Sequence, residues 1–587
     1  MDIGVPSVRN LFRIKAERRL LWIAIGITSI PLHLLYNSAV YTSLAANDFF
    51  LTRVTSDHFD LGGYLNATEV FHSYRWTSRN ATTGKEYGDI GYQTDSHDTQ
   101  QFTSMLEGHN ASTPSYQDLT PSRCANLYNR DFVSNRRNLF LITNYTSNSR
   151  FNNTLLSLQI VQGNESLPTS WMYPDSLFES GRCDGGMITS MVAKGHPWLV
   201  TLSTGEEVEV SGCKSEITDE KCKVQFSLGI MIAVICCNLV KACAMIITVV
   251  RSREPTLVTL GDAIDSFLRI PDPTTRGICF ADRRFIDREW RRGWRTGPRQ
   301  WKQMGVQRWW TSVSKTRWIT CNFFFAIAII ATAVLLKFRL YNDGLNLKTD
   351  IRSMWSRGFG KVNSVSLLKT IHFRNIPESV LLANLPQTIL SFLFLTYNSL
   401  FTCMLAGHEW SLLGHNHCTL RVTSPRPGQR STYWLQVPYT YAIPLMTLSG
   451  LLHWLTSQSI FLARVEVSDQ FGWEISSTIN TVGYSCIAII FVLTLCILAL
   501  LAAGGMGFNS FSAEITTVGC CSAAISAACH SRGADAEGIV GKKVRWGDVG
   551  YGPNQGVKHL TFRVRRMWGS QYLGRYILGR GEGRNDL

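Results

Sequence analysis

Eight polar side chains interrupt long apolar stretches of the sequence, where they could bind a ligand or carry a proton or an ion. Polar groups are costly in lipid, so such residues are typical of transport pathways. They also join helices through hydrogen bonds, and a lysine stem can reach from within the bilayer to its surface. The sequence leaves both interpretations open for His33, Asn37, Asn238, Lys241, Asn384, Gln387, His453 and Gln458.

A second group combines imidazole, carboxylate and thiol side chains. His408, Glu409, His415, His417 and Cys418 are suitable ligands for zinc, but their spacing matches no zinc motif. The phosphate-binding loop, zinc-protease and nucleophile-elbow motifs are missing from the sequence. We therefore predict no metal, no cofactor and no catalytic residue, and favour a protein that is not an enzyme.

Six apolar stretches meet or approach the length of about 20 residues that a helix needs to cross a bilayer. Only 17% of the residues are charged and 45% are apolar. A soluble protein would need a very large polar shell to bury so many long apolar helices. The predicted fold is an all-α membrane bundle of about six transmembrane helices, at 20–46, 224–250, 318–336, 380–405, 437–463 and 484–504.

The first stretch could instead be a signal peptide, because basic residues precede it and the segment 43–46 resembles a cleavage site. Its length and its polar residues favour an uncleaved helix.

Glycosylation signals orient these helices. Acceptor sites must face the lumen, and every one of them falls in the loop 47–223. This loop is therefore expected outside the cell, together with 337–379. The N-terminal segment 1–19, the loops 251–317 and 406–436 and the tail 505–587 are expected in the cytoplasm, below the plasma membrane. The sites are Asn66, Asn80, Asn110, Asn144, Asn152 and Asn164.

Basic residues support this orientation. The loop 251–317 holds 15 Lys and Arg residues, and such cytoplasmic loops face anionic lipids. The loop 337–379 is also basic, and the orientation does not explain it. In the loop 251–317, Trp and Arg residues interleave over 283–318, as they do at membrane surfaces and in proteins that bind single-stranded nucleic acid. We favour a segment that lies on the bilayer and expect no nucleic acid partner.

The large outer loop is expected to be a partly β domain stapled by disulfides. Strands are predicted at 139–143 and 155–161, and 199–210 alternates around a turn. Cys124, Cys183, Cys213 and Cys222 allow three pairings. We favour Cys213–Cys222 with Cys124–Cys183.

Two cytoplasmic features stand out. The segment 257–270 has its apolar residues on one face and ends before two prolines, which predicts an amphipathic helix. Cys520, Cys521 and Cys529 follow the last apolar stretch closely, so they are candidates for S-acylation, although free thiols are the simpler interpretation.

Seven segments carry a family resemblance: DIGVPSVRNL (2–11), SIPLHLLYNSAVY (29–41), QFSLGIMIAVICCNLVKA (225–242), PTLVTLGDAIDSFLRIPDPTT (255–275), ANLPQTILSFLFLTYNSLFTCML (383–405), QRSTYWLQVPYTYAIPLMTLSGLLHWLTSQSIF (429–461) and GCCSAAISAACH (519–530). They resemble a fungal family of multi-pass membrane proteins defined by an N-terminal domain of unknown function. The resemblance implies architecture and fungal origin, but no activity. Similar proteins carry further membrane-spanning sequence before DIGVPSVRNL, so the chain is expected to start inside that domain.

Three functional classes remain. A glycosylated outer domain joined to a long cytoplasmic region favours a cell-surface sensor or receptor-like protein with an unknown ligand. The polar residues in the apolar stretches favour a transporter or channel instead. No feature favours the third class, a membrane enzyme or scaffold. Polar residues that line one continuous cavity would indicate transport, whereas polar residues dispersed among helix contacts would indicate the first or third class.

The orientation is tested by changing each of the six acceptor asparagines to glutamine in turn and measuring the mobility shift that a glycosidase produces. We expect the shift to shrink stepwise. If the unmodified protein shows no shift, the loop 47–223 is cytoplasmic, and the predicted disulfides and receptor function fail with it.

Overall fold

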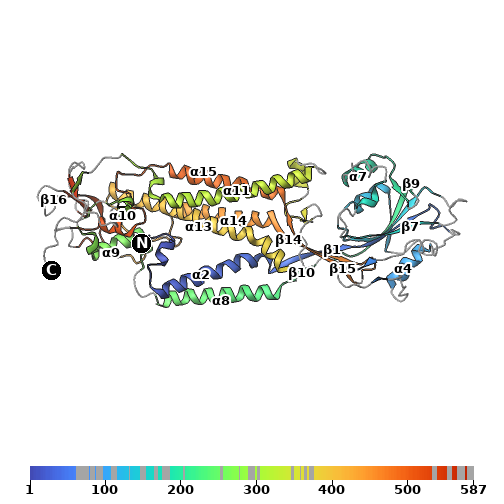
Figure 1. Ribbon diagram of the computed structural model, residues 1–587, viewed down its shortest axis with the longest axis horizontal. Helices are drawn as coiled ribbons and strands as arrows, with labels where there is room; N and C mark the ends of the chain where they lie inside the picture. The colour runs from blue at the N-terminus through green and yellow to red at the C-terminus, as the bar shows by residue number, and fades with distance from the viewer. Residues whose placement is uncertain are drawn as a thin grey trace.

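The computed structural model arranges the chain in three parts along one axis (Figure 1). A helical bundle forms the middle. A domain built from residues of the segment 49–217, here called the β-domain, lies at one end. A second domain, here called the basal domain, lies at the other end, beside the N-terminus. It contains α9 (Leu260–Arg269), α10 (Arg283–Arg288) and β16 (Arg545–Tyr551). The structure describes all residues except 61–77, 80–85, 88–96, 108–114, 131, 146–153, 164–168, 175–184, 203–204, 222, 252–255, 277, 280, 289–297, 301–304, 345–349, 357, 363–365, 369–375, 473, 532–537, 552–557, 565–574 and 578–587.

Five helices in the described part of the chain are long and apolar enough to cross a membrane. The chain is therefore a membrane protein. The 40-residue helix α13 contacts α2, α11, α14 and α15, so it is the centre of the bundle. The five helices are α2 (Ala16–Leu35), α8 (Leu228–Arg251), α11 (Lys315–Gly344), α13 (Ile376–His415) and α15 (Cys486–Gly507).

The predicted all-α fold of about six transmembrane helices is wrong. The predicted stretch 437–463 forms α14 (Tyr439–Ser459), which packs on α13 and α15 but is not among the five helices that meet the requirement. The chain also contains sheets of six and four strands. The prediction failed because a long apolar run was interpreted as helix throughout, whereas the far ends of 20–46 and 437–463 are strands.

These two strands, β1 and β14, belong to a four-stranded sheet, here called the stalk. Its strand order is β10-β1-β14-β15. Each stalk strand continues a helix with at most a few residues between them. The short helix η1 (Tyr36–Ser38) joins α2 to β1, and Ser485 joins β15 to α15. Four helices of the bundle thus leave it as neighbouring strands: α2 as β1 (Val40–Asn47), α8 as β10 (Lys223–Phe226), α14 as β14 (Ile460–Ser468) and α15 as β15 (Ile475–Tyr484).

The β-domain is a six-stranded sheet with apolar cores on both faces. Side chains alternate across a strand, so Leu51 and Leu139 belong to one core and Phe50 and Phe140 to the other. Helices α5 and α7 lie on the first face, and Phe102 of α4 packs in the second core. The elements are β2 (Phe49–Val54), α4 (His97–Leu106), β5 (Tyr116–Leu119), α5 (Pro121–Tyr128), β6 (Arg136–Thr143), β7 (Leu155–Val161), α7 (Gly185–Ala193), β8 (Leu199–Thr201) and β9 (Glu207–Ile217).

The strands predicted in this domain are confirmed as β6, β7 and the β8–β9 pair. The favoured disulfide pairing is wrong, because Cys124 of α5 is bonded to Cys213 of β9. The bond joins residues that are 89 positions apart in sequence, and in the chain-entropy account a loop of this length stabilises the fold by about 4.6 kcal/mol. Cys183 and Cys222 lie outside the described residues.

The basal domain has its own apolar core, to which α9, α10, α16, β12, β16, β17 and the end of α13 contribute. Its helix α9 confirms the predicted amphipathic helix, and Thr259 and Asp262 form a capping box at its start. The apolar face of α9 is buried in this core. The elements are α1 (Val8–Leu11), α9 (Leu260–Arg269), α10 (Arg283–Arg288), β11 (Pro298–Gln300), β12 (Arg421–Val422), β13 (Arg430–Ser431), α16 (Ser522–Ala527), β16 (Arg545–Tyr551), β17 (Lys558–Arg563) and β18 (Arg575–Ile577).

One sequence interpretation of the basal segments is corrected, and for the three cysteines the simpler interpretation, free thiols, holds. Trp309 was expected on the bilayer, but it is 5% exposed and its ring centroid lies 4.7 Å from that of His408, whereas Trp310 is 44% exposed. Cys520, Cys521 and Cys529 are all buried, which removes them as sites of S-acylation in this conformation. Trp290, Trp294 and Trp301 lie outside the described residues.

The close approach of α9 to β12 yields a prediction. A Cβ atom at Gly261 would lie 2.1 Å from the carbonyl oxygen of Arg421 and 2.9 Å from its amide nitrogen, and neither backbone atom can move freely. We expect Gly261→Ala to lower the free energy of unfolding by about 1–3 kcal/mol, measured as a lower Tm of the purified protein. Gly26→Ala on α2, where no neighbouring atom lies within 4 Å, is the control and should not lower Tm, because alanine favours a helix more than glycine does.

Candidate functional site

Three of the predicted polar residues meet where α2, α13 and α14 pack. The amide of Gln387 donates to the carbonyl oxygen of His453 at 2.9 Å, and its Oε1 lies 2.6 Å from His453 Nδ1. The rings of His33 and His453 stack with centroids 6.0 Å apart. Ser391 links them, since its hydroxyl lies 3.3 Å from His33 Nδ1 and 3.5 Å from His453 Nε2. Ser391 was missed in the sequence, although it lies one helical turn after Gln387.

Asn384 does not join this cluster but donates hydrogen bonds to the end of helix α2. Its Nδ2 donates to the carbonyl oxygen of Leu34 and to the hydroxyl of Ser38, both at 2.8 Å. The last carbonyl groups of a helix lack partners within the helix. Asn384 therefore satisfies the backbone at the point where α2 gives way to the stalk.

The remaining predicted polar residues do not join this group. Lys241 of α8 donates to the Ser29 hydroxyl of α2 at 2.9 Å, one turn from His33. Gln458 lies against the backbone of Gly360, and Asn37 and Asn238 are exposed on the surface of the bundle. The polar residues thus connect helices in separate contacts, with one cluster around Ser391.

A second set of polar contacts joins the stalk to the β-domain. Asp48 is the single residue between β1 and β2, and it is 6% exposed. Its carboxylate accepts from the Gly163 amide at 2.8 Å and from the Ser476 hydroxyl at 2.7 Å, and its own amide donates to Ser468. Burial raises the pKa of Asp48, and Asp469 adds to this rise.

The tip of the β14–β15 hairpin docks on the sheet of the β-domain. Asn138 donates to the carbonyl oxygen of Gln470 at 3.3 Å, and Arg137 donates to that of Phe471. The Phe471 ring lies 5.5 Å from the ring of Phe50. Arg137 also forms a buried ion pair with Glu216. The hairpin therefore carries the bundle's strands into the core of the β-domain.

Within the stalk, a nearly buried carboxylate joins three strands. Glu466 of β14 pairs with Arg464 at 3.2 Å and with Lys223 of β10 at 3.6 Å, and it accepts from Gln225. Burial acts to raise the pKa of Glu466, but Gln225, Arg464 and Lys223 together hold it below its ordinary value. The carboxylate is therefore ionised near neutral pH and holds β10 and β14 together. Tyr41 of β1 bonds to Gln225 at 3.1 Å and so adds the third strand.

At the opposite end, Asp2 ties the N-terminal segment to the bundle. Its carboxylate, 8% exposed, lies 3.2 Å from both Arg283 of α10 and Arg317 of α11. Burial acts to raise the pKa of Asp2, but the two guanidinium groups and a hydrogen bond from Ser7 hold it below its ordinary value.

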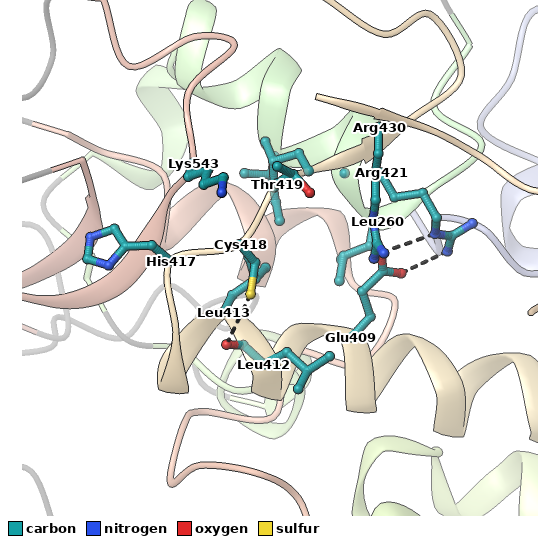
Figure 2. A pocket seen from close by; sticks show the side chains of 13 residues that line it. Leu260, Glu409, Leu412, Leu413, His417, Cys418, Thr419, Arg421, Arg430 and Lys543 are labelled. Carbon is teal, nitrogen blue, oxygen red and sulfur yellow. Dashed lines mark hydrogen bonds and ion pairs between the residues drawn. The ribbon is translucent and has the colours of Figure 1, made fainter. Parts of the chain in front are cut away.

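The basal domain also contains a pocket of about 260 Å³ (Figure 2). It lies at the end of α13, between α9, the segment 417–421 and Lys543. Glu409 of α13 binds Arg421 at 2.7 and 3.1 Å. Leu260, Ile264, Leu413 and Leu420 form its apolar part.

The residues at 408–418 that could have bound zinc make other contacts in the structure. His408 lies against Trp309 at 4.7 Å, and Glu409 is engaged by Arg421. Cys418 pairs its backbone with Val544. Within the part of the chain that the structure describes, no three His, Cys, Asp or Glu residues are grouped to hold a metal.

Of the predicted glycosylation sites, only Asn144 belongs to the described residues. Its side chain is exposed at the end of β6 and donates to Glu209 at 2.9 Å. Asn66, Asn80, Asn110, Asn152 and Asn164 lie outside the described residues.

The Ser391 cluster yields a second prediction. Replacing Gln387 or His453 by leucine removes a hydrogen-bonded partner between α13 and α14, and such interhelical bonds are worth about 0.6 kcal/mol on average in membrane proteins. A double-mutant cycle with Gln387→Leu and His453→Leu, followed by unfolding in mixed detergent, should give a coupling free energy of about 0.5–1.5 kcal/mol. Strict additivity would contradict the contact. Asn238→Leu, at an exposed position of α8, is the control and should not destabilise.

Sequence comparison identifies two regions. Residues 1–43 match a family of unknown function (DUF6536), and residues 296–571 match a domain of unknown function (DUF8419). The expected resemblance to a family defined by an N-terminal domain of unknown function is confirmed to that extent. Comparison with curated proteins and with solved structures gives no match. The two matched regions meet in the structure through Asp2 and Arg317.

Proposed function

We propose that the chain is a membrane sensor that couples the state of the β-domain to the basal domain. The observation that carries this proposal is the direct continuation of four helices into the four stalk strands. A helix joined to a strand through a long loop would transmit little movement, because the loop would absorb it. Here the strands are hydrogen-bonded to one another, so a displacement of the β-domain acts on four helices together.

The central helix extends this connection to the basal domain. Helix α13 contacts β14 and β15 near its first turns and β16 at its other end. There, Trp410 is buried, donates to the carbonyl oxygen of Thr516 at 2.9 Å and lies 5.6 Å from the Phe562 ring. One uninterrupted helix therefore belongs to the bundle and to the basal core. Coupling between distant sites needs such a contiguous packed element.

We further propose that the β-domain faces the outside of a fungal plasma membrane and carries glycans, and that the basal domain lies in the cytoplasm. The disulfide and the exposed Asn144 of the β-domain support an oxidising, glycosylating side. At the other end, Arg9, Arg13 and Lys15 are exposed before or at the start of α2, where they would meet anionic lipids.

A transporter or channel is the second candidate, and the Ser391 cluster favours it. Two stacked imidazoles and a bridging hydroxyl, with His33 at the surface of the apolar bundle, resemble the residues that relay protons in membranes. Reconstituted vesicles with a pH-sensitive dye inside distinguish the two functions. Proton flux that disappears in His453→Leu would support transport.

The sensor is tested on the full chain in lipid nanodiscs. A panel of nanobodies against the β-domain supplies the perturbation, and amide hydrogen exchange of 409–421 supplies the readout. A coupling free energy of 1–3 kcal/mol changes exchange by about fivefold or more. Insertion of two glycines between Ser485 and Cys486 should abolish this change, because it separates β15 from α15.

The same insertion after Gly195, in an exposed turn of the β-domain, is the control and should preserve the coupling. If no nanobody changes exchange at 409–421, or if both insertions behave alike, the sensor proposal is wrong.

A further inference from the structure

The basal pocket has features of a ligand site that the sensor proposal does not use. Its position joins the bundle to the basal domain: Glu409, Leu412 and Leu413 come from the end of α13, Leu260 and Ile264 from α9, and Lys543 precedes β16. Its volume of about 260 Å³ lies just below the range of about 300–1,000 Å³ that is usual for small-molecule sites, so it fits only a small ligand.

Two backbone contacts place the basic residues at this pocket. The amide of Cys418 donates to the carbonyl oxygen of Val544 at 3.0 Å, and that of Val544 to Cys418 at 3.1 Å. This bridge fixes Lys543 beside Cys418. The amide of Arg430 donates to the carbonyl oxygen of Leu420 at 2.9 Å, which fixes Arg430 beside the same segment. In Figure 2, Lys543 and the Glu409–Arg421 pair lie on opposite sides of Cys418 and Thr419.

The basic side chains are not fully neutralised. Arg421 is committed, because besides binding Glu409 it donates to the Thr432 hydroxyl and to the carbonyl oxygen of Gln436. Arg430 reaches the same Glu409 only at 3.5 Å, and its side chain is 49% exposed. Lys543 is exposed, and no ion pair joins it to another described residue. The lining residues therefore include three cations, Arg421, Arg430 and Lys543, and one carboxylate, Glu409.

Polar groups without charge complete the lining. Thr419 presents a hydroxyl, and Cys418 presents a thiol whose sulfur lies 3.7 Å from the carbonyl oxygen of Leu412. Burial raises the pKa of Cys418, while Arg430 and Lys543 act in the opposite direction, so both cations are close enough to affect one thiol. The thiol stays protonated at neutral pH and is not a nucleophile.

We propose that this pocket binds a phosphate monoester with a small apolar group. The phosphate lies between Lys543 and Arg430 within reach of the Thr419 hydroxyl, and the apolar group lies on Leu260, Ile264 and Leu413. A phosphate monoester carries a charge of about −1.5 to −2 at pH 7, which matches the excess of two positive charges among the lining residues. A carboxylate would leave one of these charges uncompensated.

The ester can come from a soluble metabolite or from a lipid headgroup. The full chain in phosphatidylcholine nanodiscs is titrated with phenyl phosphate, with dihexanoyl phosphatidic acid and with inorganic phosphate, and binding is measured by calorimetry. Binding of phenyl phosphate indicates a soluble ligand, and binding of the short-chain lipid alone indicates a headgroup. Inorganic phosphate should bind about tenfold or more weakly, because it makes no apolar contact.

The variants Lys543→Gln and Arg430→Gln should each weaken binding of the preferred probe about tenfold, the effect of one charge-assisted hydrogen bond. Lys542→Gln is the matched control. Lys542 is exposed and adjacent in sequence but does not line the pocket, so binding should remain within about twofold.

The proposal is wrong if neither ester binds, if inorganic phosphate binds as tightly as the esters, or if Lys542→Gln and Lys543→Gln weaken binding equally. None of these outcomes depends on signalling, so the result is independent of the sensor proposal.

Discussion

The structure depends on how backbone hydrogen bonds are satisfied where four helices leave the bundle. Within lipid, only a helix or a closed sheet satisfies its own backbone. Outside lipid, a segment can exchange hydrogen bonds within its own helix for hydrogen bonds to another segment. Here the four segments pair with one another and form the stalk sheet. Asn384 marks this change, because it binds the carbonyl oxygen of Leu34 near the last turn of α2. The helices are therefore joined to the β-domain by hydrogen-bonded strands.

This constraint gives the chain a continuous mechanical axis. Strand β1 enters the β-domain sheet after the single residue Asp48, and the β14–β15 hairpin ends against Asn138 and Phe50 of the same domain. At the other end, the buried Trp410 of α13 belongs to the basal core. Packed elements without flexible joints favour coupled movement over independent domain motion. The polar contacts inside the bundle serve the same rigidity, since most of them connect one helix to the next.

The basal pocket places a candidate ligand site at one end of this axis. It contains the end of α13, so a bound anion would contact the same helix that reaches the stalk. A ligand shifts a conformational equilibrium only by its difference in affinity for the two states. The ion pair of Glu409 with Arg430 would give such a difference in affinity. An anion bound at Arg430 competes with Glu409 for its guanidinium, so it would bind more tightly to a state in which this ion pair is broken.

The sequence by itself located the five helices that can cross a membrane, the strands β6 and β7 and the amphipathic helix α9, because apolar length and periodicity are local properties, but it added a sixth transmembrane helix at 437–463. It could not distinguish helix from strand at the ends of 20–46 and 437–463. There the apolar run continues, but the backbone stops bonding within its own helix and bonds to neighbouring strands instead. Tertiary structure alone decided which cysteine faces Cys124, which polar residues gather around Ser391 and which charges surround the basal pocket. These pairs lie far apart in sequence, so only packing brings them together.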